Sequence, residues 1–152
     1  MTPLQTWGMP LIALLPVLAV VGLIGTAEEQ VVAEADGVRL EVSYPRRSHR
    51  DVTTPLTVTV SNLRGSALED VYVLVPRDYV ERFDKFELRP SAEWVSADSF
   101  RLSLGSVPPG ESRVATALLT PGDYGRVSGS VQVGSGGEAP LVNAEFATVT
   151  FP

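Results

Sequence analysis

The sequence predicts an all-β fold, a two-sheet sandwich of about seven to nine short strands, behind one N-terminal transmembrane helix. Three observations lead to this expectation. From residue 37 onward apolar side chains recur at every second position, which is the pattern of strands with one buried face. Clusters of Gly, Pro, Asn and Ser separate these runs at short intervals and predict turns. The first 27 residues, in contrast, carry no charged side chain.

The N-terminal segment, residues 1–27, is expected to be a membrane anchor. Its apolar run from Trp7 to Thr26 measures about 30 Å as a helix, which matches the hydrocarbon core of a bilayer. Trp7 stands where an interfacial aromatic residue is expected, Pro10 in the first turn, and Pro16 where it kinks the helix. A cleaved signal peptide is the alternative, because small residues occupy positions 25–27, but no Lys or Arg precedes the run.

The rest of the chain is expected to be an acidic linker over residues 28–36 and one sandwich domain over residues 37–152. The segment from Asp78 to Phe86 is expected to contain a short helical turn. A domain of this size needs no disulfide, which agrees with the absence of Cys, and its many short strands are typical of an immunoglobulin-like sandwich. The expected strands are 38–42, 56–61, 71–75, 100–104, 113–119, 126–133 and 144–151.

Three stretches of this domain have a recurrent form. In Pro55–Val75 (PLTVTVSNLRGSALEDVYVLV) one strand ends in Asn62, a Gly-containing turn follows, and the next strand opens with polar residues. Leu104–Pro121 (LGSVPPGESRVATALLTP) and Pro121–Val133 (PGDYGRVSGSVQV) contain Pro-Gly turns that lead into strands. These stretches resemble bacterial and archaeal immunoglobulin-like domains of the CARDB type. The resemblance implies the sandwich fold but no activity, and it makes Tyr124 a candidate corner tyrosine that caps a bend.

Composition and motifs exclude several classes of function. The net charge of −6 argues against a nucleic-acid-binding protein, for which a basic face is expected. The chain has no Cys and a single histidine, His49, and it has no Asp-rich calcium loop, so no metal or other cofactor is expected. No Gly-x-Ser-x-Gly motif is present and no second histidine completes a catalytic triad. The sequence therefore predicts a protein that is not an enzyme.

Two groups of residues are candidates for interaction. Arg46, Arg47 and Arg50 surround His49 and suit lipid phosphates or an acidic partner, although a solvated loop is the simpler interpretation. The second group either caps the open end of the sandwich or forms an exposed contact patch, and it consists of Tyr79, Arg82, Phe83, Phe86 and Trp94. The carboxylates of the same segment alternate with basic residues and are expected to form surface ion pairs.

The expected function is that of a non-catalytic, single-pass membrane-anchored accessory subunit. Its sandwich and helix would dock onto other membrane-protein subunits of a larger complex, respiratory or photosynthetic for instance, with the lipid bilayer as the other partner and no nucleic acid. The sandwich is expected on the periplasmic or extracytoplasmic side, by analogy with the usual placement of such domains. The alternative is an independent cell-envelope binding module for carbohydrate or protein.

Overall fold

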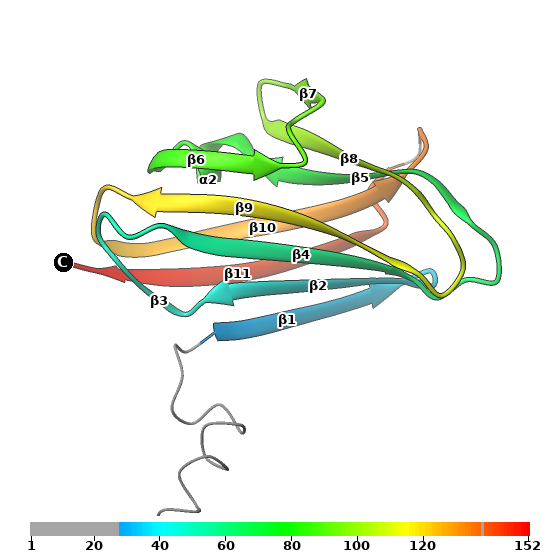
Figure 1. Cartoon of the computed structure of the whole chain (residues 1–152), viewed down its shortest axis with the longest axis horizontal. Coiled ribbons are helices and arrows are strands. Elements are labelled where there is room, and N and C mark those ends of the chain that lie inside the picture. Colours follow the sequence, from blue (N-terminus) through cyan, green and yellow to red (C-terminus); the bar gives the residue numbers. More distant parts are fainter. Residues whose placement is uncertain (1–27, 138) are drawn as a thin grey trace, which may run out of the picture.

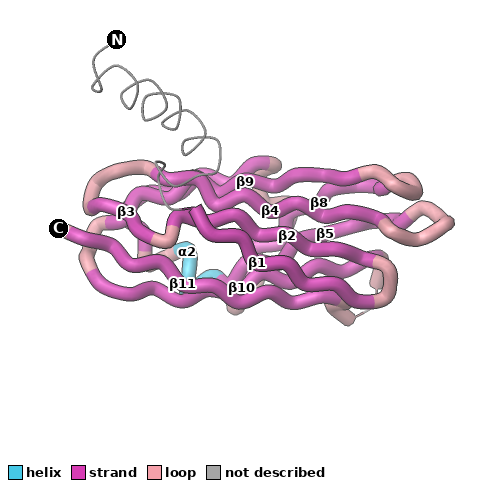
Figure 2. The backbone as a smooth tube through the Cα atoms, turned by 90° about the horizontal axis from the view of Figure 1, so that it is seen from below, coloured by secondary structure: helices cyan, strands magenta, loops and turns pink. Residues whose placement is uncertain are grey.

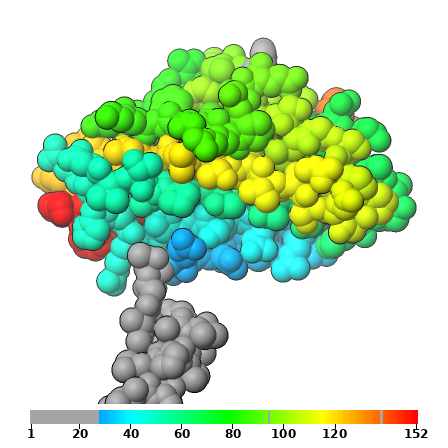
Figure 3. Space-filling model, viewed as in Figure 1, coloured from blue at the N-terminus to red at the C-terminus, as the bar shows by residue number. Residues whose placement is uncertain are grey.

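The computed structural model describes residues 28–137 and 139–152, which form a sandwich of two β-sheets (Figure 1). The first sheet has the strand order β1-β2-β4-β9-β6, and the second has the order β3-β11-β10-β5-β8-β7. Neighbouring strands are antiparallel, except that β3 runs parallel to β11. Figure 3 shows the outer face of the first sheet, from β1 at its lower edge to β6 at its upper edge.

The strands of the first sheet are β1 (Glu28–Ala35), β2 (Val38–Pro45), β4 (Thr54–Asn62), β9 (Ser112–Pro121) and β6 (Phe83–Arg89). Those of the second sheet are β3 (Arg47–His49), β11 (Val142–Phe151), β10 (Gly125–Ser135), β5 (Leu68–Pro76), β8 (Ser99–Val107) and β7 (Trp94–Val95). A single helical turn, α2 (Arg77–Val80), follows β5.

The two sheets enclose one core because alternate residues of each strand point inward. On β2 the inward residues are Val38, Leu40 and Val42, all fully buried, and between them stand the more exposed Arg39 and Glu41. Burying a Val or Leu side chain stabilises a fold by about 1.5–3 kcal/mol, so a core of this size holds the sheets together without a crosslink. All seven strand ranges predicted from the alternation lie within strands of the structure, which confirms that prediction. The expected helical turn is α2.

The acidic segment expected as a linker differs in the structure, where Glu28–Ala35 form β1 and pair with β2 along its whole length. The two strands are joined by Asp36 and Gly37, which both have positive φ, 51° and 74°. This is the backbone of a type I′ hairpin turn, for which Asp-Gly is a favoured sequence. The glutamates do not prevent strand formation, because β1 lies at an edge of the sheet and its inward residues Val31, Ala33 and Ala35 pack against the core.

The edges of both sheets carry features that oppose further strand pairing. β1 bears glutamates, and β6 alternates acidic and basic side chains. The other two edge strands, β3 and β7, are only three and two residues long. Charged or very short edge strands are a common defence against edge-to-edge association, so open sheet edges are not the natural contact surface of this molecule.

The expected membrane helix falls on residues 1–27, together with Trp7, Pro10 and Pro16, and therefore lies outside the described residues. In the part of the chain that the structure describes, no helix has the length and apolar character required to cross a bilayer.

Tyr124 is not a corner tyrosine, so that expectation is wrong. It lies in the turn between β9 and β10, and 69% of its surface is exposed. The bend into β10 occurs at its first residue, Gly125, whose φ of 127° is readily adopted by glycine but rarely by other residues.

Candidate functional site

A groove crosses the second sheet where β5 leaves β10. Residues Gln132–Ser135 of β10 pair with β5, whereas Gly125–Val131 pair only with β11. Here β5 ends at Pro76, and the chain continues directly into α2, which is drawn in cyan in Figure 2. The groove has a volume of about 830 Å³. Its lining residues are Glu29, Tyr44, Arg46, Pro76, Asp78, Tyr79, Arg126, Ser128, Gly129, Ser130, Glu145, Phe146, Ala147 and Val149.

The floor of the groove is made of small side chains. Ser128 on β10 pairs with Ala147 on β11, and neither is among the buried residues, so this pair faces outward. The next outward pair in one direction is Ser130 with Glu145, and in the other direction it is Arg126 with Val149. The floor therefore runs from a cationic end to an anionic end, with small residues between them.

One wall of the groove is formed where β1 begins and β2 ends. The Tyr44 hydroxyl donates a hydrogen bond of 2.9 Å to Glu29 Oε2, and Arg46 Nη1 lies 3.3 Å from Glu29 Oε1. Burial and the hydrogen bond to Glu29 both raise the pKa of Tyr44. Both charged side chains are well exposed, so the ion pair contributes at most about 1 kcal/mol to stability. It places a carboxylate and a guanidinium side by side at the groove.

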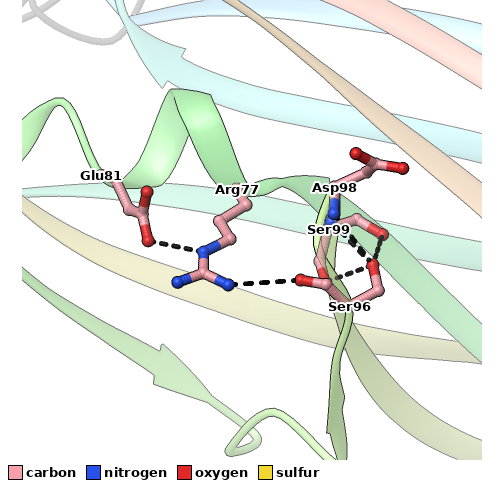
Figure 4. Close-up of polar contacts among 5 residues, drawn as sticks. All are labelled: Arg77, Glu81, Ser96, Asp98 and Ser99. Carbon is pink, nitrogen blue, oxygen red and sulfur yellow. Dashed lines mark hydrogen bonds and ion pairs between the residues drawn. The ribbon is translucent and has the colours of Figure 1, made fainter.

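The opposite wall is α2, which polar contacts attach to the turn before β8 (Figure 4). Arg77 Nε donates to Glu81 Oε1 at 2.6 Å, and the Arg77 backbone N–H donates to Asp98 O at 2.9 Å. Ser96 Oγ accepts from the backbone N–H of Ser99 at 2.9 Å, which closes the turn. Because α2 is a single turn, these contacts rather than helix length keep it in place, and with it the groove residue Asp78.

Aromatic rings form a row under the groove, through the interior of the sandwich. Tyr44 lies 5.3 Å from Phe146, Phe146 lies 5.4 Å from Tyr79, and Tyr79 lies 5.3 Å from Phe83, measured between ring centroids. Burial raises the pKa of Tyr79. The rings are buried, so the groove offers their edges and hydroxyls rather than open ring faces.

The groove is lined by polar and charged groups. Among the described residues, no group of three or more His, Cys, Asp or Glu side chains is placed to hold a metal ion. The groove contains serines but no histidine or cysteine, so none of its serines has a histidine base beside it. What it does present is hydroxyl groups, carboxylates and guanidinium groups, which suit hydrogen bonds and ion pairs with a polar ligand.

The three arginines expected to act together are divided by the structure. Arg46 belongs to the groove, where it pairs with Glu29. Arg47 is exposed on β3, and Arg50 lies 3.8 Å from Asp51 in the turn after β3. His49 is also exposed, at the end of β3.

The aromatic candidates are divided as well. Tyr79 and Phe83 are core residues, so they fit the interpretation that this group caps the sandwich and not that it forms an exposed patch. Phe86 is 42% exposed on β6 with its ring 5.7 Å from that of Phe100, and Arg82 is exposed between α2 and β6. The side chain of Trp94 is outside the description. The described aromatic residues therefore do not gather on one surface.

Sequence reasoning missed most of the groove, including Glu29, Arg126, Ser128, Ser130 and Glu145. One signal was present, the sequence Ser128-Gly129-Ser130 within an otherwise regular strand. A glycine inside a strand often marks a place where another group approaches the backbone closely, and here Tyr79 and Phe146 do so.

No protein-family model matches the sequence, and no curated protein matches it. The chain is similar to two solved structures of a CARDB domain, that of the PF1109 protein from Pyrococcus furiosus. The solution NMR structure has 15% identity and a TM-score of 0.47, over 81% of this chain and 94% of that chain. The crystal structure, which is in complex with di-metal ions, has 18% identity and a TM-score of 0.44, over 82% of this chain and 89% of that chain. Both TM-scores are below 0.5, so the sandwich fold is shown by the two sheets of the chain itself and not by this similarity.

Proposed function

We propose that this chain is a non-catalytic accessory protein, held at a membrane by residues 1–27, whose groove docks a segment of another membrane-protein subunit. The observation that carries the proposal is the groove itself, which is large, open to one face of the sandwich and lined by charged side chains of both signs. Small-molecule and cofactor sites are mostly apolar and enclose their ligands. A polar lining with separate cationic and anionic ends fits a polypeptide segment with complementary charges.

The remaining surface is consistent with a docking protein that uses one limited contact. Exposed apolar residues are scattered over different elements, for example Val32 on β1, Val52 after β3 and Val114 on β9. Permanent subunit interfaces are usually large and apolar, whereas limited contacts are more polar. The apolar run of residues 7–26 supplies the membrane attachment in this proposal, with the sandwich on the extracytoplasmic side.

Site-specific photocrosslinking in native membranes tests the proposal. Ser128, in the floor of the groove, is replaced by p-benzoyl-phenylalanine, and Thr59, on the outer face of the first sheet, is replaced in the same way as the control. We expect Ser128 to crosslink to one defined membrane protein and Thr59 to give none or much less. Equal crosslinking from both positions would contradict docking through the groove.

A second measurement separates this proposal from an independent binding module for carbohydrate. The groove has serine and tyrosine hydroxyls, carboxylates and arginines, which also suit sugar hydroxyl groups, although its ring faces are buried. After extraction in mild detergent, an accessory subunit comigrates with other membrane proteins on a sizing column. A lone monomer that binds glycans, and loses this binding in the Ser130→Arg variant, would favour the carbohydrate module instead.

A further inference from the structure

A second surface adjoins the cationic end of the groove floor, Arg126 and Val149, and lies at the end of the sandwich that holds β3. In the parallel pair of β3 and β11, Ser48 and Thr150 share a hydrogen bond of 2.9 Å and are both buried. Because neighbouring residues of a strand point to opposite faces, the flanking residues point outward. The resulting surface, here called the β3 patch, consists of Arg47, His49, Arg126, Val149 and Phe151.

The β3 patch combines unpaired arginines with exposed apolar side chains. Val149 stands between Arg47 on one neighbouring strand and Arg126 on the other, because it is the register partner of both. Among the described residues neither arginine forms a salt bridge. Phe151 is 42% exposed, and its ring lies 6.4 Å from that of His49.

The β3 patch is close to the point where the described chain begins. Glu28, the first residue of β1, is the register partner of Pro45. The next residue, Arg46, contacts both β1 and β11. Its guanidinium pairs with Glu29 on β1, and its carbonyl accepts a hydrogen bond of 3.1 Å from the Val149 backbone N–H on β11. The apolar run of the sequence ends at Thr26, and the two residue steps from Thr26 to Glu28 span at most about 7 Å.

We propose that the β3 patch lies against the phosphate and headgroup layer of the bilayer in which residues 1–27 are anchored. This inference rests on the membrane attachment in the proposed function, and it adds an orientation. Only Ala27 separates the apolar run from Glu28, which leaves β1 no room to move away from the bilayer surface. Arginine forks bind phosphate oxygens, and exposed Phe and Val side chains suit the boundary between headgroups and acyl chains.

Neighbouring acidic residues determine which lipids the patch suits. Glu28 and Glu29 lie at the start of β1, and Asp51 follows Arg50. These carboxylates offset much of the positive charge at this end of the sandwich. The contact is therefore with the phosphate that every phospholipid carries, and we expect little dependence on the proportion of anionic lipid.

Fluorescence quenching in reconstituted vesicles tests the orientation. The chain has no Cys, so single cysteines can be labelled without removing others. The full-length protein is labelled at His49→Cys, within the patch, or at Val114→Cys, which is exposed on the first sheet. It is reconstituted into phosphatidylcholine vesicles with headgroup-attached nitroxide lipids. We expect the nitroxide to quench the His49 label at least three-fold more than the Val114 label. The double variant Arg47→Glu, Arg126→Glu is expected to reduce this ratio.

The outcomes separate the orientation from the rest of the proposal. Protein that floats with the vesicles and shows equal quenching at both positions would overturn the β3 patch as a membrane contact, and would leave anchoring and the groove intact. Protein that does not float with the vesicles would overturn anchoring and the patch together. Docking through the groove is judged independently by the crosslinking from Ser128.

Discussion

The Tyr79 ring occupies the space that a side chain at Gly129 would fill. A Cβ atom added to Gly129 would lie 2.7 Å from the ring carbons Cδ2 and Cε2 of Tyr79, and 2.9 Å from Cζ of Phe146. Carbon atoms at van der Waals contact are about 3.5–4.0 Å apart, so residue 129 must be glycine for the aromatic row to pack as it does. The groove and the core of the sandwich therefore meet at this position.

We expect Gly129→Ala to destabilise the fold by about 1–3 kcal/mol, because buried aromatic rings cannot move aside as the end of a flexible side chain can. Urea denaturation followed by tryptophan or tyrosine fluorescence measures the change. Gly65→Ala is the matched control, because no atom lies within 4 Å of its Cβ position. The packing argument fails if both variants unfold at the same urea concentration.

Prediction from the sequence succeeded where periodicity alone decides the structure. The alternation of β4, with Leu56, Val58 and Val60 inward, can be read from the residues and is what the sheet has. The groove could not be predicted in this way, because it depends on where β5 leaves β10 and on the position of α2. Those are properties of strand register and of distant contacts such as that of Arg77 with Asp98, which no local pattern records.

Asn62, the residue that ends β4, has a side chain that is held by three hydrogen bonds. Its side chain is fully buried, and Nδ2 donates to Ser66 O at 2.8 Å and to Val107 O at 2.9 Å. Its Oδ1 accepts a hydrogen bond of 2.8 Å from the Arg64 backbone N–H. The amide thus joins the end of β4 to the following turn and to the end of β8.

We expect Asn62→Asp to cost about 3 kcal/mol or more, because the carboxylate cannot donate to either carbonyl and places a charge in the core. Thermal and urea unfolding measure this loss. Ser61→Ala, on the exposed face of the same strand, removes only a hydrogen bond with Ser112 and is expected to change stability by less than about 0.5 kcal/mol. A loss of similar size in both variants would show that the buried amide has no special role.

Hydrogen exchange can test whether residues 28–35 form a strand, as in the structure, or a linker, as their composition predicts. Glutamates dominated the interpretation of residues 28–36 as a linker, although Asp36-Gly37 is itself a hairpin signal. In the structure β1 pairs with β2, so we expect about half of its backbone amides to be protected in hydrogen exchange, as in any edge strand with one bonded side. In a flexible linker, none of these backbone amides would be protected from exchange.

The turn variant Gly37→Val makes this prediction sharper. A β-branched residue at a φ of 74° is strained by about 1–2 kcal/mol, and its Cβ would also meet Arg64 Cγ at 2.7 Å. We expect exchange protection in β1 to fall while protection in β10 remains. Uniform loss of protection in both strands would instead mean that β1 and the core unfold as one unit.

The buried tyrosine predicts how stability depends on pH. Burial raises the pKa of Tyr79 in the folded state, whereas the unfolded chain has the ordinary value of about 10. The folded state therefore keeps its proton to higher pH than the unfolded state. The stabilisation is fully present below about pH 10 and is lost as pH rises above it, at up to about 1.4 kcal/mol per pH unit.

We expect Tyr79→Phe to reduce this loss between about pH 10 and 11, because the variant has no phenol to ionise at position 79. At pH 7 the variant should be almost as stable as the parent, since no hydrogen bond of the Tyr79 hydroxyl is found among the described residues. Because no fully buried polar side-chain atom there lacks a partner, this hydroxyl keeps contact with solvent at the groove. Urea midpoints at pH 8, 10 and 11 measure the effect. Tyr124→Phe, at an exposed position, is the control and should follow the parent. If Tyr79→Phe loses stability with pH as steeply as the parent, ionisation of the buried phenol is not what limits the fold in alkali, and the remaining tyrosine with a raised pKa, Tyr44, becomes the group to replace.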